Sequence, residues 1–532
     1  MVNSKRMNKK GITLIIAYTV IASVLILTGV IIQRAISESN LAQRTRVYTE
    51  AFYLAEGVLA QASYQLAFNE ANYITVSDID PANPVIVNIP NANAALSYFW
   101  TDITSDLTGS SGDQQITDSS GITSFLRYYQ ISATCTHNQY ATRVTLNQTI
   151  IRRKIYTFQH AVFYQDDLEI LPGAAMIFSG KIHCNHDIYL GTHNSLTVNS
   201  DYLYSAGSIY NKRKDSTEVM SGPVNIKVNG TSNYELMKKA GELSLDCDRA
   251  DWTDESQNRW QGTVKSSVHG VKSLTAPAVG SIQPDGYYAQ KATLKIIDNT
   301  AYDINGNPIT FSDNPISTST FYDAREGKNI TVTNIDMAKL NSSGYFPANG
   351  LLYATRSDAN STQPNGIRLK NASLVQNDLT VVSNDPVYVQ GDYNKDVSGQ
   401  KKSCAIIADS MNILSNNWSD STPTSSRTAS NTEVNAAFIA GIRTSTSGDY
   451  NGGLENYPRL LEKWSGKTLK IRGSFVELWN SQIAMGQWHY GMPYYEAPAR
   501  NWDYDLDFNN SSKLPPFTPF AVEIKRIVWW KG

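Results

Sequence analysis

The stretch from Met7 to Asn40, MNKKGITLIIAYTVIASVLILTGVIIQRAISESN, decides how the chain begins its fold. Residues 12–32 carry no charged side chain, and at ~1.5 Å per residue a helix of that length crosses a ~30 Å hydrocarbon core. A secretory signal has a shorter apolar core followed by a small-residue cleavage site, and none follows here before Gln33. We therefore predict an anchor that the protein keeps.

The charges around this anchor predict its orientation. Lys5, Arg6, Lys9 and Lys10 precede the apolar stretch. An excess of lysine and arginine before a first span holds that end in the cytoplasm. The sequence thus predicts a single-pass protein with a cytoplasmic N-terminus, in which everything after Arg34 is exported.

The helix is predicted to continue beyond the membrane. Proline does not occur before Pro81, and apolar residues recur at steps of four and three along one helical face. This stripe consists of Tyr48, Phe52, Ala55, Leu59, Ala62 and Leu66. We expect one helix from Ile12 to about Phe68, with Gly29 and Gly57 as its weakest points.

Composition excludes several classes of protein. The chain has 532 residues, of which 18% are charged and 41% are hydrophobic, and its formal net charge is -2. It is therefore not a disordered chain, and it has no basic block after residue 10 that would predict a nucleic-acid partner. Its four cysteines are too few and too scattered for a disulfide framework, and three pairings remain open.

After about Asn69 the helical pattern ends, and the sequence pattern becomes one of short strands. Alternating apolar residues separated by Gly, Asn and Ser recur, as in GPVNIKVNG (222–230) and NDLTVVSNDPVYVQGDYN (377–394). A spacing of roughly 8–14 residues between strand centres favours stacked rungs over a sandwich. We predict an α+β protein, mainly β, with a β-solenoid-like ectodomain of the right-handed β-helix type.

Local patterns interrupt this plan. Residues 99–153 predict an antiparallel strand pair packed on the stem helix. Residues 233–252 have helical spacing, and GGLENYPRLLEKW (452–464) predicts a short helix that buries Leu454, Tyr457, Leu460, Leu461 and Trp464, with Arg459 and Glu462 as an exposed pair. DINGN (303–307) resembles the start of a calcium loop, but Asn-Gly favours a hairpin turn.

Two groups of segments resemble a known family. KKG followed directly by ITLIIAYTVIASVLILTGV, and then RTRVYTEAFYLAEGVLAQA, resembles the N-terminus of type IV pilin-like proteins, in particular PilX-like minor pilins. Later blocks, among them DLTVVSNDPVYVQGDYN and LPPFTPF, look like those of large PilX-like assembly proteins. The chain departs from the family pattern at the fifth mature position, which is Ile16 where most such subunits have glutamate.

The resemblance implies a processing site, partners and a location. A prepilin peptidase would cut after Gly11 and leave Ile12 as the new N-terminus. Implied partners are other pilin-like subunits and the inner-membrane pilus assembly machinery. The precursor would lie in the inner membrane, and its ectodomain would reach the periplasm or the cell surface within a filament.

The resulting domain plan has six parts. They are a leader (1–11), a transmembrane and amphipathic stem helix (12–68), pilin-like head strands (69–160), solenoid-like rungs (161–230), an inserted helix with an irregular β region (231–345), and a C-terminal β-rich domain (346–532). The predicted function is a non-enzymatic minor subunit, tip-located and involved in filament assembly.

A membrane-tethered polysaccharide-active enzyme is the weakest alternative. Such an enzyme needs two or three carboxylates that converge in one cleft. The candidates Asp378, Asp385, Asp392 and Asp409 stand mainly beside Asn, Gly or Pro, where aspartate serves turns. No catalytic residue is therefore predicted.

Alternating aspartates suggest one metal site. In DYDLD, Asp503, Asp505 and Asp507 would lie on one face of an extended segment, where a hard cation or a basic partner must balance their charges. Calcium is the candidate ion there, the alternative is pairing with Arg500 or a solvated loop, and no other cofactor is predicted.

An aromatic cluster suggests a binding surface. Tyr490, Tyr494, Tyr495 and Trp502 gather in HYGMPYYEAPARNW (489–502), and large rigid rings suit contacts with sugars or proteins. These residues support the second prediction for function, a surface adhesin that uses the pilin stem only as its anchor. The alternative is that the rings cap the end of the solenoid.

Overall fold

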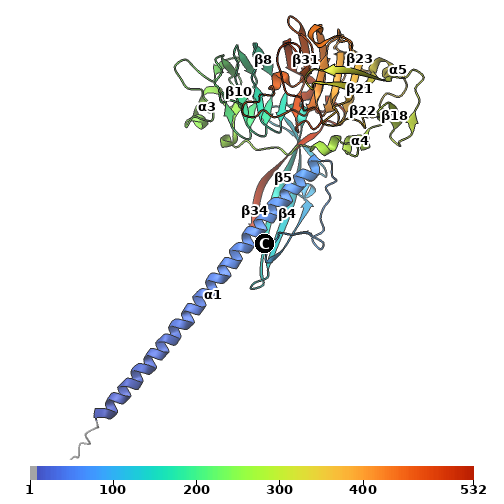
Figure 1. The fold of residues 1–532 in the computed structure, drawn as a ribbon. Helices are drawn as coiled ribbons and strands as arrows, with labels where there is room; N and C mark the ends of the chain where they lie inside the picture. Colours follow the sequence, from blue (N-terminus) through green and yellow to red (C-terminus); the bar gives the residue numbers. More distant parts are fainter. Residues whose placement is uncertain (1–8) are drawn as a thin grey trace, which may run out of the picture.

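The computed structural model describes residues 9–532, so the first eight residues of the predicted leader lie outside the described part. Helix α1 (Lys9–Ala71) is one unbroken helix of 63 residues, about 95 Å long at ~1.5 Å per residue (Figure 1). Gly29 and Gly57 both lie inside it without interrupting it. The long N-terminal helix that the sequence predicts is confirmed.

The two halves of α1 differ in what covers them. All residues from Gly11 to Arg46 are exposed, and burial begins at Val47. The buried face then consists of Val47, Ala51, Ala55, Val58, Leu59, Ala62, Leu66, Ala67 and Ala71. The predicted stripe is correct from Ala55 onward. Phe52 is half-buried and packs against the edge of this core, whereas Tyr48 is exposed because Val47 takes the buried position.

An antiparallel sheet, here called the stalk sheet, covers this second half of α1 (Figure 1). Its strand order is β1-β2-β4-β5-β34, with β3 paired to β4. The strands are β1 (Val85–Val87), β2 (Ala94–Asp102), β3 (Gln114–Thr117), β4 (Thr123–His137), β5 (Thr142–Tyr156) and β34 (Phe520–Lys531), and helix α2 (Thr104–Thr108) follows β2. Tyr98, Trp100, Ile131 and Ile150 pack against the buried alanines of α1. The predicted antiparallel pair on the stem helix is confirmed.

The N-terminal half of the body winds the chain through three parallel stacks. One turn takes about 20 residues, since Val162 of the first strand pairs with Ile182 and Ile182 pairs with Leu203. The stacks are β6-β9-β12-β16, β7-β10-β13 and β8-β11-β14, and β15 joins the last of these antiparallel. The strands are β6 (Val162–Tyr164), β7 (Leu168–Ile170), β8 (Met176–Ser179), β9 (Ile182–Cys184), β10 (Ile188–Leu190), β11 (Leu196–Asn199), β12 (Leu203–Ser205), β13 (Ile209–Tyr210), β14 (Val224–Lys227), β15 (Tyr234–Leu236) and β16 (Val264–Lys265).

The C-terminal half has two larger stacks. Strands β17, β22, β24, β26, β29 and β32 form one parallel series, and β21, β23, β25, β28, β31 and β33 form the other, with β27 and β30 alongside. The outer end carries antiparallel strands, so the sheets are mixed. The strands are β17 (Leu294–Ile297), β18 (Thr300–Asp303), β19 (Pro308–Ile309), β20 (Ile316–Asp323), β21 (Lys328–Asp336), β22 (Leu351–Thr355), β23 (Gly366–Ala372), β24 (Leu379–Val382), β25 (Val387–Tyr393), β26 (Cys404–Ala408), β27 (Met411–Leu414), β28 (Thr432–Asn435), β29 (Ala437–Ala440), β30 (Arg459–Leu460), β31 (Thr468–Gly473), β32 (Phe475–Glu477) and β33 (Ala499–Tyr504).

Helices in the body are short. The α-helices are α3 (Trp252–Trp260), α4 (Tyr287–Lys291) and α5 (Met337–Ser342). Single 3-10 turns occur at Thr157–Gln159, Ser267–His269, Val279–Ile282, Thr424–Ser426, Leu454–Asn456, Leu506–Asn509 and Ser511–Lys513.

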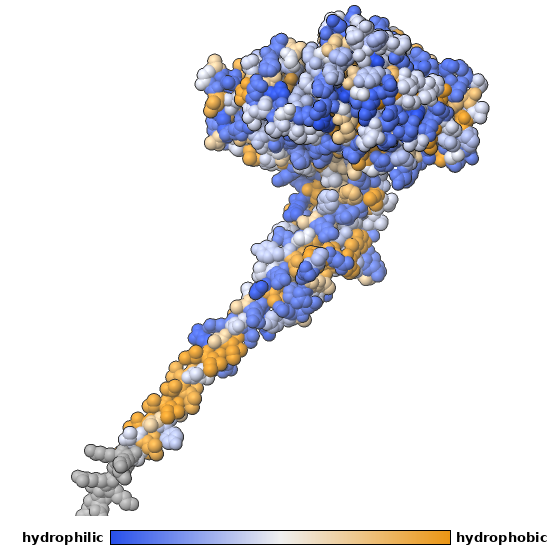
Figure 2. Space-filling model, in the orientation of Figure 1, coloured by the Kyte–Doolittle hydropathy of each residue, from blue (hydrophilic) through white to orange (hydrophobic). Residues whose placement is uncertain are grey.

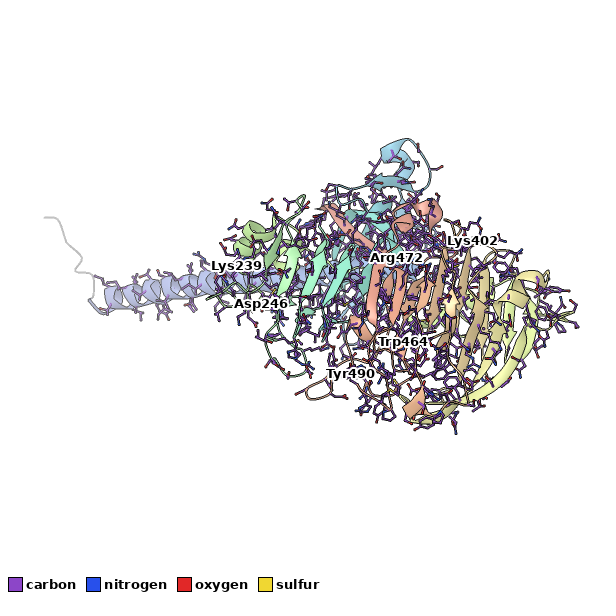
Figure 3. The ribbon with its side chains drawn as sticks, turned by 90° about the horizontal axis from the view of Figure 1, so that it is seen from above. Lys239, Asp246, Lys402, Trp464, Arg472 and Tyr490 are labelled. Atoms are coloured by element: carbon purple, nitrogen blue, oxygen red, sulfur yellow. The ribbon has the colours of Figure 1, made fainter. Side chains whose placement is uncertain are left out.

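The two halves of the body meet above the stalk. Strand β32 pairs in parallel with β6, with Phe475 opposite Val162 and Glu477 opposite Tyr164. The chain therefore enters the body at its middle, winds outward to β16, crosses to the far end, and winds back to the middle before β34 rejoins the stalk sheet (Figure 1). Seen from above, the strands stand side by side in one row through both halves (Figure 3).

Three local predictions were wrong. Residues 452–464 form a 3-10 turn and strand β30 instead of a helix, because the segment is buried on nearly all sides rather than along one face. Arg459 and Glu462 are buried rather than exposed, and Arg459 pairs with Glu326 at 2.6 Å. In residues 233–252 the helical prediction fails as well, since β15 and turns precede α3.

Candidate functional site

The first candidate region is the bare half of α1. Figure 2 shows a hydrophobic band along this end of the stem, and the large apolar residues from Leu14 to Ile36 are all exposed. The helix is long and apolar enough to cross a membrane. Thr19, Ser23 and Thr28 donate their hydroxyls to carbonyls of the preceding turn, which satisfies these groups without water. This surface is suited to hydrocarbon or to neighbouring helices.

The predicted processing residues lie at the start of this surface. Gly11 and Ile12 are both exposed, and no atom stands within 4 Å of the place where a Cβ on Gly11 would lie. Ile16, which takes the place of the family's glutamate, is also exposed. The chain itself therefore leaves Gly11 accessible to another protein.

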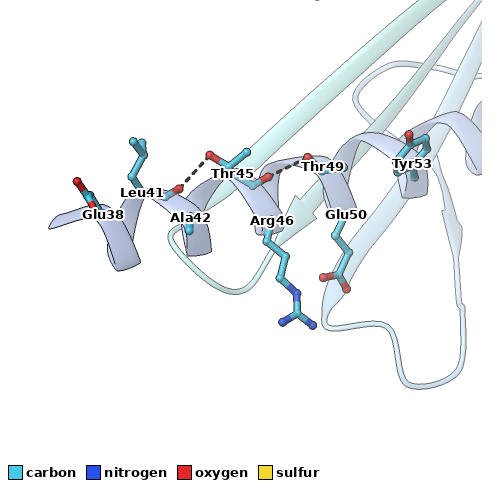
Figure 4. Close-up of a pocket in the computed structure, with 8 residues that line it drawn as sticks. All are labelled: Glu38, Leu41, Ala42, Thr45, Arg46, Thr49, Glu50 and Tyr53. Atoms are coloured by element: carbon cyan, nitrogen blue, oxygen red, sulfur yellow. Dashed lines mark hydrogen bonds between the residues drawn. The ribbon is translucent and has the colours of Figure 1, made fainter. Parts of the chain in front are cut away.

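A second candidate area lies farther along α1, beyond the bare end of the helix (Figure 4). It is a shallow hollow lined by Glu38, Leu41, Ala42, Thr45, Arg46, Thr49, Glu50 and Tyr53. Thr45 and Thr49 donate back to the carbonyls of Leu41 and Thr45. The hollow therefore offers an apolar side chain, Leu41, beside charged groups of both signs.

The structure separates Asp503 from the other two aspartates predicted to bind calcium. Asp505 and Asp507 both accept hydrogen bonds from the ammonium of Lys401, at 2.7 Å each for the shortest contacts. Asp503 lies against Arg472 instead, with 3.3 Å between Nη2 and Oδ2. In residues 9–532, no group of three or more His, Cys, Asp or Glu side chains is arranged to hold a metal ion. Arg500, the alternative partner, forms no ion pair with any of these three aspartates in the described chain. Calcium binding at these residues stays a prediction.

The four aspartates weighed as catalytic candidates bind backbone amides at corners of the body. Asp378 accepts from Ser403 N, Asp385 from Arg356 N, Asp392 from Glu433 N, and Asp409 from the amides of residues 482–484. These contacts match the turn role that the sequence predicts.

The predicted aromatic cluster divides into exposed and buried members. Tyr490 is 60% exposed and Tyr494 is half-buried, whereas Tyr495 and Trp502 are buried. Trp502 stacks on Phe475 in the core, with 5.3 Å between the ring centroids. Tyr490 and Tyr495 line a cavity of about 400 Å³ together with Tyr450 and Trp488.

The sequence reasoning missed two buried acidic residues at the joint, the place where the two halves of the body meet. Glu477 on β32 accepts hydrogen bonds from Gln165 N and Asp166 N at 3.0 and 2.9 Å, and Glu455 accepts one from Leu171 N at 3.1 Å. Both acids thus hold corners of the N-terminal half from the C-terminal half. No local pattern marks them, because their partners lie some 300 residues away.

The cysteines take part in none of these features. All four thiols are unpaired within the described residues, with Cys135, Cys184 and Cys404 buried.

Comparisons with known proteins add little to this geometry. No family profile matches the sequence, and no curated protein matches it. One similar solved structure is the crystal structure of the competence-associated pilin ComZ from Thermus thermophilus, with 11% identity, a TM-score of 0.29, and coverage of 91% of this chain and 97% of that chain. At that identity and TM-score the likeness assigns this chain to no family, so the function is argued from the chain itself.

Proposed function

We propose that this protein is a non-enzymatic, pilin-like minor subunit of a type IV pilus or a related secretion filament, of the PilX-like kind. The observation that carries the proposal is the division of α1. One half is bare and apolar, and the other half is packed under an antiparallel sheet that supports a large body. A soluble protein does not leave such a helix uncovered, so this half requires a membrane before assembly and other stem helices afterwards.

The proposal includes a location and a set of partners. The precursor spans the inner membrane once, with Lys9 and Lys10 on the cytoplasmic side and the body exported. Its partners are a prepilin peptidase, other pilin-like subunits and the inner-membrane assembly machinery.

The body is proposed to be a β-solenoid of the right-handed β-helix type. In its support, strands one turn apart pair in parallel, and their inward residues stack in register, as Val162, Ile182 and Leu203 do. Each turn thus covers the face that its neighbour leaves open.

The experiment that tests the function is a processing assay on Gly11. Gly11→Val should leave full-length precursor in the inner membrane of a strain that contains the peptidase, because a side chain would occupy the site at which the bond is cut. Gly29→Val is the matched control, since Gly29 also lies in α1 with open space around it, and this variant should be processed normally. Mass spectrometry that finds an intact leader on the wild-type chain would refute the proposal.

A second candidate function is attachment, with the stem only as an anchor. The exposed ring of Tyr490 beside the cavity favours it. Loss of the gene should abolish piliation or secretion under the first proposal, and attachment alone under the second.

A further inference from the structure

The cavity beside Tyr490, a residue labelled in Figure 3, is lined by residues from both halves of the body. Its walls come from the first turns of the N-terminal half, which include Leu171 and Arg213, and from residues 450–456 and 488–500 of the C-terminal half. Its volume of about 400 Å³ lies in the range of small-molecule sites.

A continuous chain of aromatic rings forms one wall. Tyr450 meets Trp488 edge to face at 5.2 Å, Trp488 and Tyr490 lie nearly parallel at 6.4 Å, and Tyr490 meets Tyr495 edge to face at 5.5 Å. The planes of Trp488 and Tyr490 are 28° apart, so the two rings stack on each other and the exposed Tyr490 ends the chain of rings.

Hydrogen bonds fix this wall before any ligand arrives. Trp488 Nε1 donates to the Tyr495 hydroxyl at 2.9 Å, and that hydroxyl donates to Asn456 Oδ1. Tyr450 donates its hydroxyl to Glu455 Oε1 at 2.7 Å. A wall held in this way loses little conformational entropy on binding.

Arg500 is the charged side chain of the cavity wall that keeps unused donors. Glu455 has both oxygens hydrogen-bonded within the protein, since Oε1 accepts from Tyr450 and Oε2 from Leu171 N. Arg213 is held by Asp215 through two hydrogen bonds of 2.8 and 2.9 Å. Arg500 donates only from Nε, to the Glu455 carbonyl at 3.0 Å, and within the described chain its two Nη groups donate no hydrogen bond.

We propose that this cavity binds an acidic saccharide, in which a uronic acid ring stacks on the exposed ring of Tyr490 while its carboxylate pairs with Arg500. The apolar C–H face of a pyranose suits a flat aromatic surface, and the two free Nη groups suit the two oxygens of a carboxylate. Glu455 is the one carboxylate among the described lining residues, whereas glycoside hydrolysis by an acid and a base requires two, so the proposal is for binding.

This inference is independent of the proposed role of the stem. A Gly11→Val chain, blocked in processing, should bind saccharide as the wild type does, so the two proposals fail separately.

The test is a titration of the full-length protein in detergent with an alginate tetrasaccharide and, in parallel, with neutral cellotetraose, followed by calorimetry. The alginate fragment should bind about tenfold more tightly, since it alone offers a carboxylate to Arg500. Arg500→Gln should remove this preference, and Tyr490→Ala should weaken both ligands about tenfold. Tyr322→Ala removes another exposed tyrosine of the body, outside the cavity, and should change neither affinity.

Several results would overturn the proposal. Absence of saturable binding by the alginate fragment would do so, as would equal binding of the two saccharides by the wild-type protein. An affinity that Tyr490→Ala leaves unchanged would place the sugar elsewhere.

Discussion

At the scale of single residues, Lys401 takes the place predicted for a metal ion. Burial alone would lower the pKa of Lys401, but its hydrogen bonds to Asp505 and Asp507 raise it overall. Hydrogen bonds from Lys401 and Lys513 in turn lower the pKa of Asp507 to about 2. The like charges that the alternating aspartates create are thus balanced by a basic partner, although it comes from a distant loop rather than from Arg500.

The first prediction removes that partner. Lys401→Met should destabilise the protein by about 2 kcal/mol in the presence of chelator, because two carboxylates lose a charged donor. Calcium at millimolar concentration should restore part of the loss and should shift the wild-type melting temperature less, since Lys401 competes with the ion. Thermal melts of both proteins with calcium and with chelator provide the measurement. Replacing Asp503, Asp505 and Asp507 with Asn should abolish the calcium effect, and identical melts of Lys401→Met in the two buffers would exclude calcium at these residues.

At the scale of elements, the joint between β6 and β32 decides whether the body is one unit. Each strand has three residues, so backbone pairing alone gives little stability. Side chains strengthen the joint: Phe475 and Phe163 are buried, and Glu477 accepts amides from the corner after β6. Burial raises the pKa of Glu477 to about 8. Burial thus favours the protonated form of this carboxyl near pH 7, against the two backbone amides that favour the charged form.

Our second prediction concerns this carboxyl. Glu477→Ala should lower the free energy of unfolding by about 2–3 kcal/mol, because Asp166 N loses its acceptor and a cavity opens at the joint. Glu477→Gln retains an acceptor oxygen and should cost much less at pH 7. Thermal or urea unfolding of the three proteins measures the difference, and equal losses in the Ala and Gln variants would show that the hydrogen bonds contribute nothing.

The pH dependence follows with a defined sign. The folded pKa of Glu477 lies above its ordinary value of 4.5, so the folded state binds the proton more tightly than the unfolded state. The stability contributed by the tighter proton binding of Glu477 is complete below about pH 4.5 and is lost as pH rises through about 8. Glu477→Gln should therefore lose less stability than the wild type between pH 5 and 9, as unfolding at a series of pH values can measure.

At the scale of the whole molecule, the body is far broader than the stem that carries it (Figure 1). Most of the chain lies beyond α1. If this protein formed a helical shaft, every subunit along the shaft would need room for such a body. In filaments of the family that the sequence resembles, a glutamate at the fifth mature position neutralises the N-terminal amine of a neighbour. Ile16 offers no such carboxylate, and an unpaired charge in hydrocarbon is costly.

The third prediction follows from this shape and from Ile16. The protein should be substoichiometric and should lie at filament tips, where it has no amine in front of it to neutralise. Immunogold labelling should mark the ends of filaments, and quantitative mass spectrometry should find far fewer copies than of the major subunit. Even labelling along the shafts, or equal amounts of both subunits, would contradict a tip location.

The sequence by itself determined the features that repeat locally. The uncharged run and the apolar stripe with a 3.6-residue period predicted α1, and the alternation of apolar and polar residues predicted β4 and β5. Asn305-Gly306 predicted the turn between β18 and β19. In each case the interacting residues lie within a few positions of one another, so their spacing records the geometry. The same method predicted a helix at 452–464, because a segment buried on nearly all sides has no polar face that would reveal its period.

Only the tertiary structure decided the rest. It brought β34 onto β5, β32 onto β6, and Lys401 between Asp505 and Asp507. It also assembled the aromatic cavity from three separated segments and turned Trp502 into the core. These contacts join residues up to several hundred positions apart, and they arise because the chain enters the body at its middle and returns there. Such pairings depend on complementary burial and charge between distant surfaces, which leave no periodic trace in the order of the residues.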